Sequence, residues 1–145
     1  TLELNSCLSW QDSPSNRLAC LRDFRLAWQD KPFEDCVRAT LKFYSKLPIS
    51  SRCVDPFDEN TWNTLWELIH NNEYCEFNRA LLYGYTLHYL GYSGQILVGH
   101  TKNSQNMISV INNTVLNASY NESVAITWLD NFTVEKKVDI KQLCG

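Results

Sequence analysis

The sequence predicts an α+β domain in which a helix-rich N-terminal half is followed by a few short strands, cross-linked by disulfides. Three observations predict this class. Apolar residues recur at three- and four-residue steps up to Gly91, short β-branched segments follow Gly94, and six cysteines are spread along the chain. With 145 residues and 44% hydrophobic content, the chain suits a single domain over residues 1–145 with a core of its own.

Four amphipathic helices are expected before Gly91. The first begins at Ser15-Asn16, directly after Pro14. The second begins after Pro32 and ends before Pro48, because proline lacks the amide hydrogen that a helix interior needs. The expected helices span residues 15–28, 33–44, 62–69 and 77–90.

The chain after Gly94 changes to segments rich in β-branched residues, which are typical of strands. Residues 107–116 fit a helix or a strand equally well. Asp130-Asn131 has the composition of a turn. The expected strands span residues 95–98, 123–128 and 134–140.

The cysteines are expected to form disulfides, since the sequence has no CxxC pair and no Cys/His cluster with zinc spacing. We expect a bridge between Cys36 and Cys53, because they flank one helix and the turn at Pro48. The remaining pairs would be Cys20 with Cys75 and Cys7 with Cys144. The last of these would tie the C-terminus to the body of the domain.

Four Asn-x-Ser/Thr sequons crowd between residues 112 and 133. Together with six cysteines they predict an extracellular location, as a secreted protein or a cell-surface ectodomain. A face that carries several glycans is bulky and hydrated, so any cleft or partner surface is expected elsewhere. The predicted acceptors are Asn112, Asn117, Asn121 and Asn131.

Composition excludes several function classes. The formal net charge is −3 and no basic stripe is present, which argues against nucleic acid. No apolar run approaches the roughly 20 residues that span a bilayer. No signal peptide is apparent, and a membrane anchor after Gly145 is left open.

Residue chemistry alone predicts no catalytic site. His70 and His88 lie in helical patterns without a nucleophile arrangement nearby. The acidic pairs Glu34-Asp35 and Asp58-Glu59 precede or begin helices, where the helix dipole favours negative charge. An aromatic set is interpreted as core or as a candidate binding face. Its members are Trp62, Trp66, Tyr83, Tyr85, Tyr89 and Tyr92.

One stretch resembles the ADP-ribosyl cyclases, the extracellular NAD glycohydrolases. Asp35-Cys36 is followed after sixteen residues by Cys53 and after twenty-one more by Cys75. Residues 78–83, Asn-Arg-Ala-Leu-Leu-Tyr, then resemble the family segment that places a tryptophan in the active site. The resemblance covers roughly residues 18–135 and implies a divergent, shortened relative that matches mainly the N-terminal half of the family.

This sequence differs from the family pattern at the positions that form the family's active site. Tyr83 stands at the first active-site tryptophan, Gly99-His100 at the acidic Glu-Asp pair and Ile108 near the second tryptophan. Glu135 is the one nearby candidate for the catalytic glutamate. A ribosyl cation needs a carboxylate beside it, so the resemblance implies a pseudoenzyme that does not hydrolyse NAD.

The sequence therefore predicts a non-enzymatic extracellular glycoprotein domain that binds an extracellular or cell-surface protein, of receptor or adhesion type. No cofactor and no metal are expected. One alternative is an NAD glycohydrolase or ADP-ribosyl cyclase with an altered active site that uses Tyr83 and Glu135. Another is a secreted carrier of small hydrophobic ligands.

Overall fold

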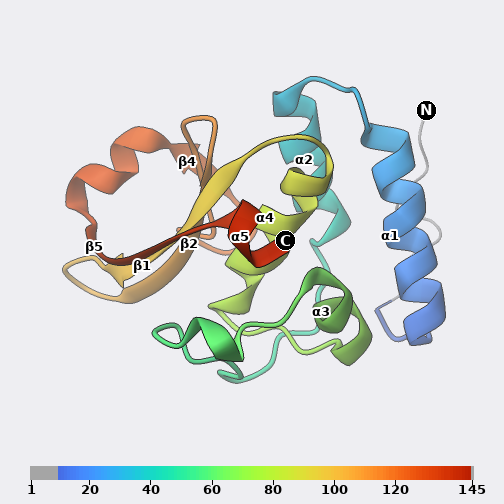
Figure 1. Cartoon of the computed structure of the whole chain (residues 1–145), viewed down its shortest axis with the longest axis horizontal. Helices are drawn as coiled ribbons and strands as arrows, with labels where there is room; N and C mark the ends of the chain where they lie inside the picture. The colour runs from blue at the N-terminus through green and yellow to red at the C-terminus, as the bar shows by residue number, and fades with distance from the viewer. Residues whose placement is uncertain (1–9, 145) are drawn as a thin grey trace.

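A computed structural model of the chain, which describes residues 10–144, shows helices packed on one face of an antiparallel sheet (Figure 1). The predicted α+β class is confirmed, with the helices first and the strands later. The helices are α1 (Pro14–Trp28), α2 (Phe33–Phe43), α3 (Leu65–Asn71), α4 (Asn78–Tyr89) and α5 (Ile140–Cys144), with 3-10 turns η1 (Glu59–Thr61) and η2 (Ile126–Asn131). The strands are β1 (Gly94–His100), β2 (Gln105–Ile111), β3 (Thr114–Leu116), β4 (Ser123–Ala125) and β5 (Thr133–Asp139).

Local capping chemistry sets the helix starts. Ser13 caps α1, its hydroxyl accepting from the Asn16 amide at 3.3 Å. Helix α3 begins later than predicted, because Thr64 and Glu67 form a reciprocal capping box. Asp58 instead caps the short turn η1.

The sheet order is β4-β3-β2-β1-β5, with all pairs antiparallel. The ambiguous segment 107–116 is a hairpin, since Asn112 and Asn113 both have positive φ, 48° and 62°. Two such residues make the tight turn whose twist matches paired strands. The segment predicted as a strand over 123–128 is strand only at β4 and continues as η2.

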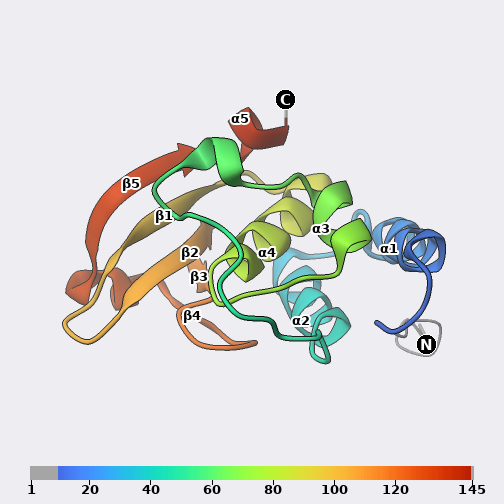
Figure 2. The ribbon, with the colours of Figure 1, turned by 90° about the horizontal axis from the view of Figure 1, so that it is seen from below.

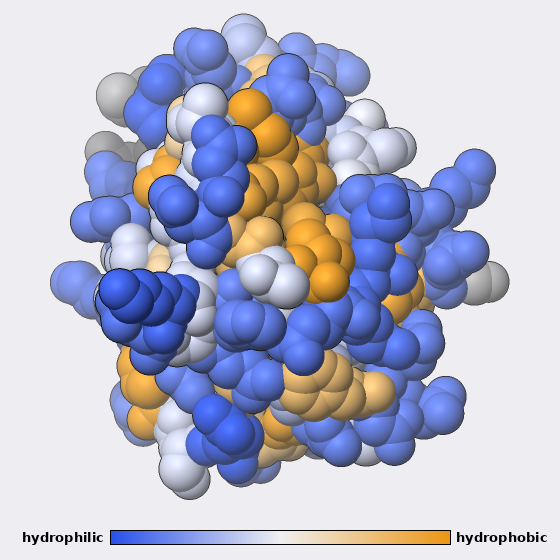
Figure 3. All heavy atoms as spheres, turned by 90° about the vertical axis from the view of Figure 1, so that its left-hand side faces the viewer, coloured by the Kyte–Doolittle hydropathy of each residue, from blue (hydrophilic) through white to orange (hydrophobic). Residues whose placement is uncertain are grey.

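Helix α4 is the centre of the molecule. Its residues from Asn78 to Leu87 are all buried, and it lies between the sheet and helices α2 and α3 (Figure 2). Successive residues of β1 pack into two different apolar clusters. Ile96 and Val98 face the helices, whereas Leu97 faces the opposite side of the sheet. A smaller cluster of Leu97, Ile108, Val115 and Phe132 lies on that other side, and side chains from the η2 segment pack against it. Figure 3 shows apolar atoms reaching the surface on the side where η2 lies in Figure 1.

The expected disulfides are not present among the described cysteines. No two of Cys20, Cys36, Cys53, Cys75 and Cys144 are at bonding distance. Cys53 lies beside Cys75 and Asn78, not beside Cys36, because the segment after Pro48 runs alongside Tyr74 through a parallel bridge at Ile49. The pairing of Cys36 with Cys53 is therefore wrong. Cys7 lies outside the described residues.

Buried tyrosines make the fold sensitive to alkali. Burial raises the pKa of Tyr83 to about 12 and also raises the pKa of Tyr44 and Tyr74. The folded state then holds each phenol proton more tightly than the unfolded chain, whose tyrosines titrate near pH 10. This contribution to stability is complete below about pH 10 and is lost as the pH rises through the folded pKa.

We therefore expect these three phenols to stay protonated until the fold opens. Absorbance at 295 nm and circular dichroism, followed together from pH 8 to 13, should show their ionisation coinciding with unfolding. The chain in strong denaturant is the control, in which all seven tyrosines should titrate together near pH 10. Full ionisation of the native protein before any loss of structure would contradict the buried placement.

Candidate functional site

The start of α4 is the polar centre of the molecule. Asn78, which is 2% exposed, accepts from the Cys75 amide at 2.9 Å through its side-chain oxygen. Its amide nitrogen donates to the Glu73 carbonyl at 3.0 Å and to Cys53 Sγ at 3.3 Å. This one side chain therefore fixes the segment around Cys53 against the first turn of α4.

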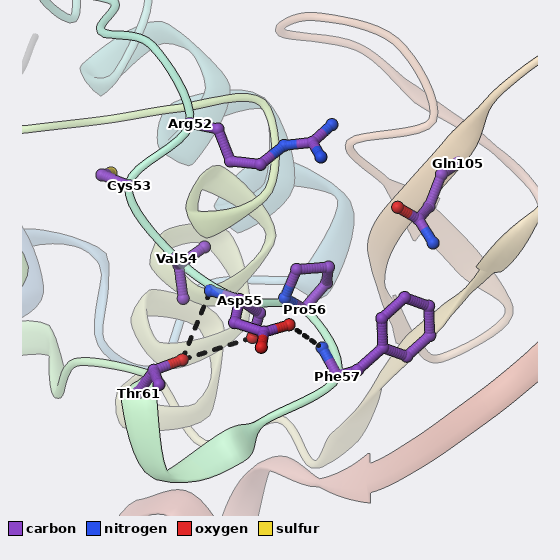
Figure 4. Close-up of a pocket in the computed structure, with 8 residues that line it drawn as sticks. All are labelled: Arg52, Cys53, Val54, Asp55, Pro56, Phe57, Thr61 and Gln105. Carbon is purple, nitrogen blue, oxygen red and sulfur yellow. Dashed lines mark hydrogen bonds between the residues drawn. The ribbon is translucent and has the colours of Figure 1, made fainter.

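Two pockets open beside this point. The larger, of about 590 Å³, lies between the 52–61 segment and the start of β2 (Figure 4). In Figure 4 the Phe57 ring points towards the side that carries Gln105, whereas Cys53 points away from it. The lining residues are Arg52, Cys53, Val54, Asp55, Pro56, Phe57, Thr61 and Gln105.

The smaller pocket has a volume of about 190 Å³ and a mostly polar lining. It shares Gln105 with the larger one, and the ion pair from Arg52 Nη2 to Glu76 Oε1, at 3.0 Å, joins their walls. We call the two pockets together the α4 groove. The smaller pocket is lined by Glu76, Arg79, Gln105, Asn106, Asn117, Ala118, Ser119 and Tyr120.

The loop after β3 forms one wall of the smaller pocket. Asn117 is 5% exposed and adopts a φ of 74°, which asparagine tolerates better than most residues. Its amide nitrogen donates to the Glu76 carbonyl at 2.7 Å and to the Met107 carbonyl at 2.9 Å. The backbone of the loop is thereby attached both to the start of α4 and to β2.

Of the charged side chains that line the smaller pocket, Glu76 has an ion-pair partner and Arg79 has none among the described residues. Glu76 is paired with Arg52 and its side chain is 60% exposed. Arg79 is only 9% exposed, the Tyr120 ring lies 4.6 Å from its guanidinium carbon, and the Tyr83 phenol also interacts with its charge. No described carboxylate forms an ion pair with Arg79. The groove therefore contains a buried cation that lies against an aromatic face and that no described carboxylate pairs with.

The thiols near the groove are not set up as nucleophiles. Burial raises the pKa of Cys53, the neighbouring Cys75 raises it further, and Cys75 itself is fully buried. The three histidines interact elsewhere, His70 with Asn71, His88 with Tyr89 and His100 with Glu135. Among the described residues, then, no cysteine is paired with a histidine base. Nor do these residues contain a group of three or more His, Cys, Asp or Glu side chains suited to a metal ion.

The aromatic residues proposed as a binding face do not form one surface. Trp62, Tyr83 and Tyr85 are buried in the core. Trp66 is 42% exposed and lies 5.8 Å from Tyr89, with the Arg25 guanidinium beside both rings. Tyr92 lies against Phe33 and donates to the Lys31 carbonyl.

The sequons differ in how much room they leave for a glycan. The amide nitrogen of Asn117 already makes two hydrogen bonds in a buried position, so the structure does not support Asn117 as an acceptor. Asn112 forms the exposed β2–β3 turn, and Asn121 and Asn131 lie in loop or 3-10 segments. Glycosylation at these three positions stays a prediction.

Of the residues that line the groove, the sequence singles out only Cys53 and Asn117, and for other roles. Arg79 had one detectable signal, a charged residue on an otherwise apolar helix. Phe57, Gln105 and Tyr120 had none, since their meeting depends on how the 52–61 segment and the loop after β3 are placed.

Comparison with solved structures finds LapG from Legionella pneumophila. A calcium-bound LapG structure has a TM-score of 0.72 and 12% sequence identity, covering 88% of this chain and 77% of that chain. A second LapG structure has a TM-score of 0.71 and 12% sequence identity, and the match covers 93% of this chain and 81% of that chain. At this identity the likeness shows a shared fold. No family model and no curated protein sequence matches the chain.

These neighbours overturn the expected family and function. LapG is a bacterial periplasmic cysteine protease, and no similarity to ADP-ribosyl cyclases is found. The predicted non-enzymatic extracellular glycoprotein of receptor or adhesion type is therefore wrong, and its alternatives are not supported. The positions that suggested a cyclase do not form one site. His100 and Glu135 pair on neighbouring strands, but Tyr83 and Ile108 lie in different apolar clusters.

Proposed function

We propose that this chain acts on polypeptides, binding an extended segment of another protein in the α4 groove. The observation that carries the proposal is the groove itself. Its two pockets share Gln105 in their linings, and each has an exposed aromatic ring, Phe57 at 47% and Tyr120 at 42% exposure. Polar side chains lie between the rings. Aromatic anchors separated by amide groups suit a peptide, whose side chains and backbone alternate in polarity.

The LapG-like fold supports a polypeptide as the target, since LapG is a protease. It also favours a second candidate function, cleavage of the bound segment. Cys75 lies directly before α4, next to the groove wall at Glu76. Cys75 is completely buried and no described histidine pairs with it, so the proposal assigns the groove as the polypeptide site and names no cleaving residue beyond this candidate.

We propose further that the chain works outside the cytoplasm, on an extracytoplasmic protein. The sequons at Asn112, Asn121 and Asn131 support this location. None of the described helices combines the length and apolarity of a membrane-spanning segment.

Replacing Phe57 or Tyr120 with alanine should weaken peptide binding by about five- to thirtyfold, because truncating an aromatic anchor typically costs about 1–2 kcal/mol. The measurement is fluorescence anisotropy of a labelled pool of random nonapeptides. Leu26→Ala is the matched control, since Leu26 is an exposed apolar residue on α1, at 66%, and does not line the groove.

The same samples separate the two candidate functions. Mass spectrometry of the pool after incubation would reveal cleavage, and loss of cleavage in Cys75→Ser with binding retained would establish the second function. Equal binding by the wild type, Phe57→Ala and Tyr120→Ala would refute the groove as the polypeptide site.

A further inference from the structure

Arg79 is a buried charged group that no described carboxylate pairs with. It belongs to the first turn of α4, is 9% exposed and lines the smaller pocket of the groove. Its Nε atom is buried without a hydrogen-bond partner. A buried guanidinium normally has an acid or carbonyl oxygens around it, because removing an unpaired charge from water is costly.

The neighbours of Arg79 compensate this charge only in part. The Tyr120 ring lies 4.6 Å from the guanidinium carbon, a cation–π contact that stabilises the charge only partly. Glu76 lines the same pocket, but its carboxylate is bonded to Arg52 at 3.0 Å. Asn117, on the opposite wall, uses its amide nitrogen for two backbone carbonyls. The pocket therefore contains a cation whose buried Nε donor has no hydrogen-bond partner, and the carboxylate in its lining, Glu76, is paired with Arg52.

We propose that Arg79 is the specificity residue of the α4 groove and binds a carboxylate of the polypeptide segment. This inference rests on the proposed polypeptide binding and narrows it to segments that carry an acidic side chain or end in a C-terminal carboxylate. A guanidinium presents its donors in a planar fork that matches the two oxygens of a carboxylate. The volume of about 190 Å³ suits a small group of this kind.

Glu76 allows a second test, in which the affinity for an acidic peptide should change in the opposite direction. Its negative charge in the pocket lining opposes an incoming carboxylate, and Arg52 offsets that charge. Glu76→Gln should therefore tighten binding of an acidic peptide, whereas Arg79→Gln should weaken it. A residue with a merely structural role would not produce opposite changes from two neutralising substitutions in one pocket.

The experiment uses isothermal titration calorimetry with the full chain and three peptides of the same length. One has acetyl and amide ends and a central glutamate, and the second has glutamine in its place. The third has only alanines and a free C-terminus. The glutamate peptide, the free-carboxylate peptide or both should bind at least about tenfold tighter than the glutamine peptide, as expected for a charge-assisted hydrogen bond.

Arg79→Gln should abolish that preference and Arg79→Lys should reduce it. Arg22→Gln, which neutralises an exposed arginine on α1, should leave it unchanged. Thermal melts verify that each variant folds. If Arg79→Gln does not fold, the test is whether Glu76→Gln binds the glutamate peptide more tightly than the wild type does. Whichever carboxylate peptide binds tighter identifies the source of the carboxylate.

The outcomes separate this inference from the proposed function. Equal binding of all three peptides would overturn the role of Arg79 and leave the groove as a polypeptide site. Failure of every peptide to bind, with acetate alone shifting the Arg79 resonances, would overturn polypeptide binding and retain the carboxylate site. Binding of inorganic phosphate but of no carboxylate would overturn the carboxylate assignment.

Discussion

Replacing Arg17 with methionine should lower the free energy of unfolding by about 3 kcal/mol. Arg17 is 6% exposed, and its Nε and Nη2 atoms donate to the carbonyls of Ile69 and His70, each at 2.9 Å. Nη1 donates to the Asp12 carbonyl. The first two carbonyls belong to the last turn of α3, where helix carbonyls have no partner within the helix. Methionine keeps much of the apolar stem but leaves these oxygens unsatisfied, at about 1–3 kcal/mol each.

The measurement is urea unfolding followed by circular dichroism. Arg22→Met, on an exposed face of the same helix, is the matched control and should change stability by no more than about 0.5 kcal/mol. A lower midpoint with an unchanged slope would locate the loss in the folded state. If Arg17→Met unfolds at the same urea concentration as Arg22→Met, the guanidinium does not hold α1 to α3.

Replacing Gly99 with alanine should lower the melting temperature by roughly 10 °C, which corresponds to about 3 kcal/mol for a chain of this size. Gly99 lies at the bulge between β1 and β5. A methyl group there would collide with the Thr133 carbonyl oxygen and with the edge of the Phe132 ring. Neither can move easily, because one is backbone in a paired strand and the other belongs to the smaller apolar cluster.

Gly84→Ala is the glycine control. The added methyl would meet the ends of the Ile140 and Ile96 side chains at 2.9 and 3.2 Å, which can adjust. The better helix propensity of alanine offsets part of that strain. Scanning calorimetry should show a change of a few degrees at most for Gly84→Ala. Equal melting temperatures for Gly99→Ala and the wild type would show that β1 and β5 are not packed as described.

The helices could be predicted because their signals are local. Pro14, Pro32 and Pro48 mark the boundaries of α1 and α2, and apolar residues at helical spacing mark α4. In the sequence Asn112-Asn113 is part of a sequon, and in the structure the same pair forms the turn that makes 107–116 a hairpin. The two interpretations are compatible: the pairing of β2 with β3 shows the turn, and glycosylation of Asn112 stays a prediction.

The site and the family could not be predicted, because both depend on contacts between distant residues. Cysteine spacing suggested a cyclase, yet Cys36 and Cys53 do not bond, so their separation carries no information on topology. Arg79 is buried without an acid because Glu76 is held by Arg52, twenty-four residues away in sequence. No helical or strand periodicity encodes that ion pair.

Amide chemical-shift mapping tests the central claim, that the α4 groove binds polypeptide, most directly. The isotopically labelled chain would be titrated with the acetylated, amidated glutamate peptide. Shifts confined to residues 52–57, 76–79, 105–106 and 117–120 are expected, since these segments line the groove. Shifts centred instead on α1 or on the η2 face, with the groove resonances unchanged, would contradict the account.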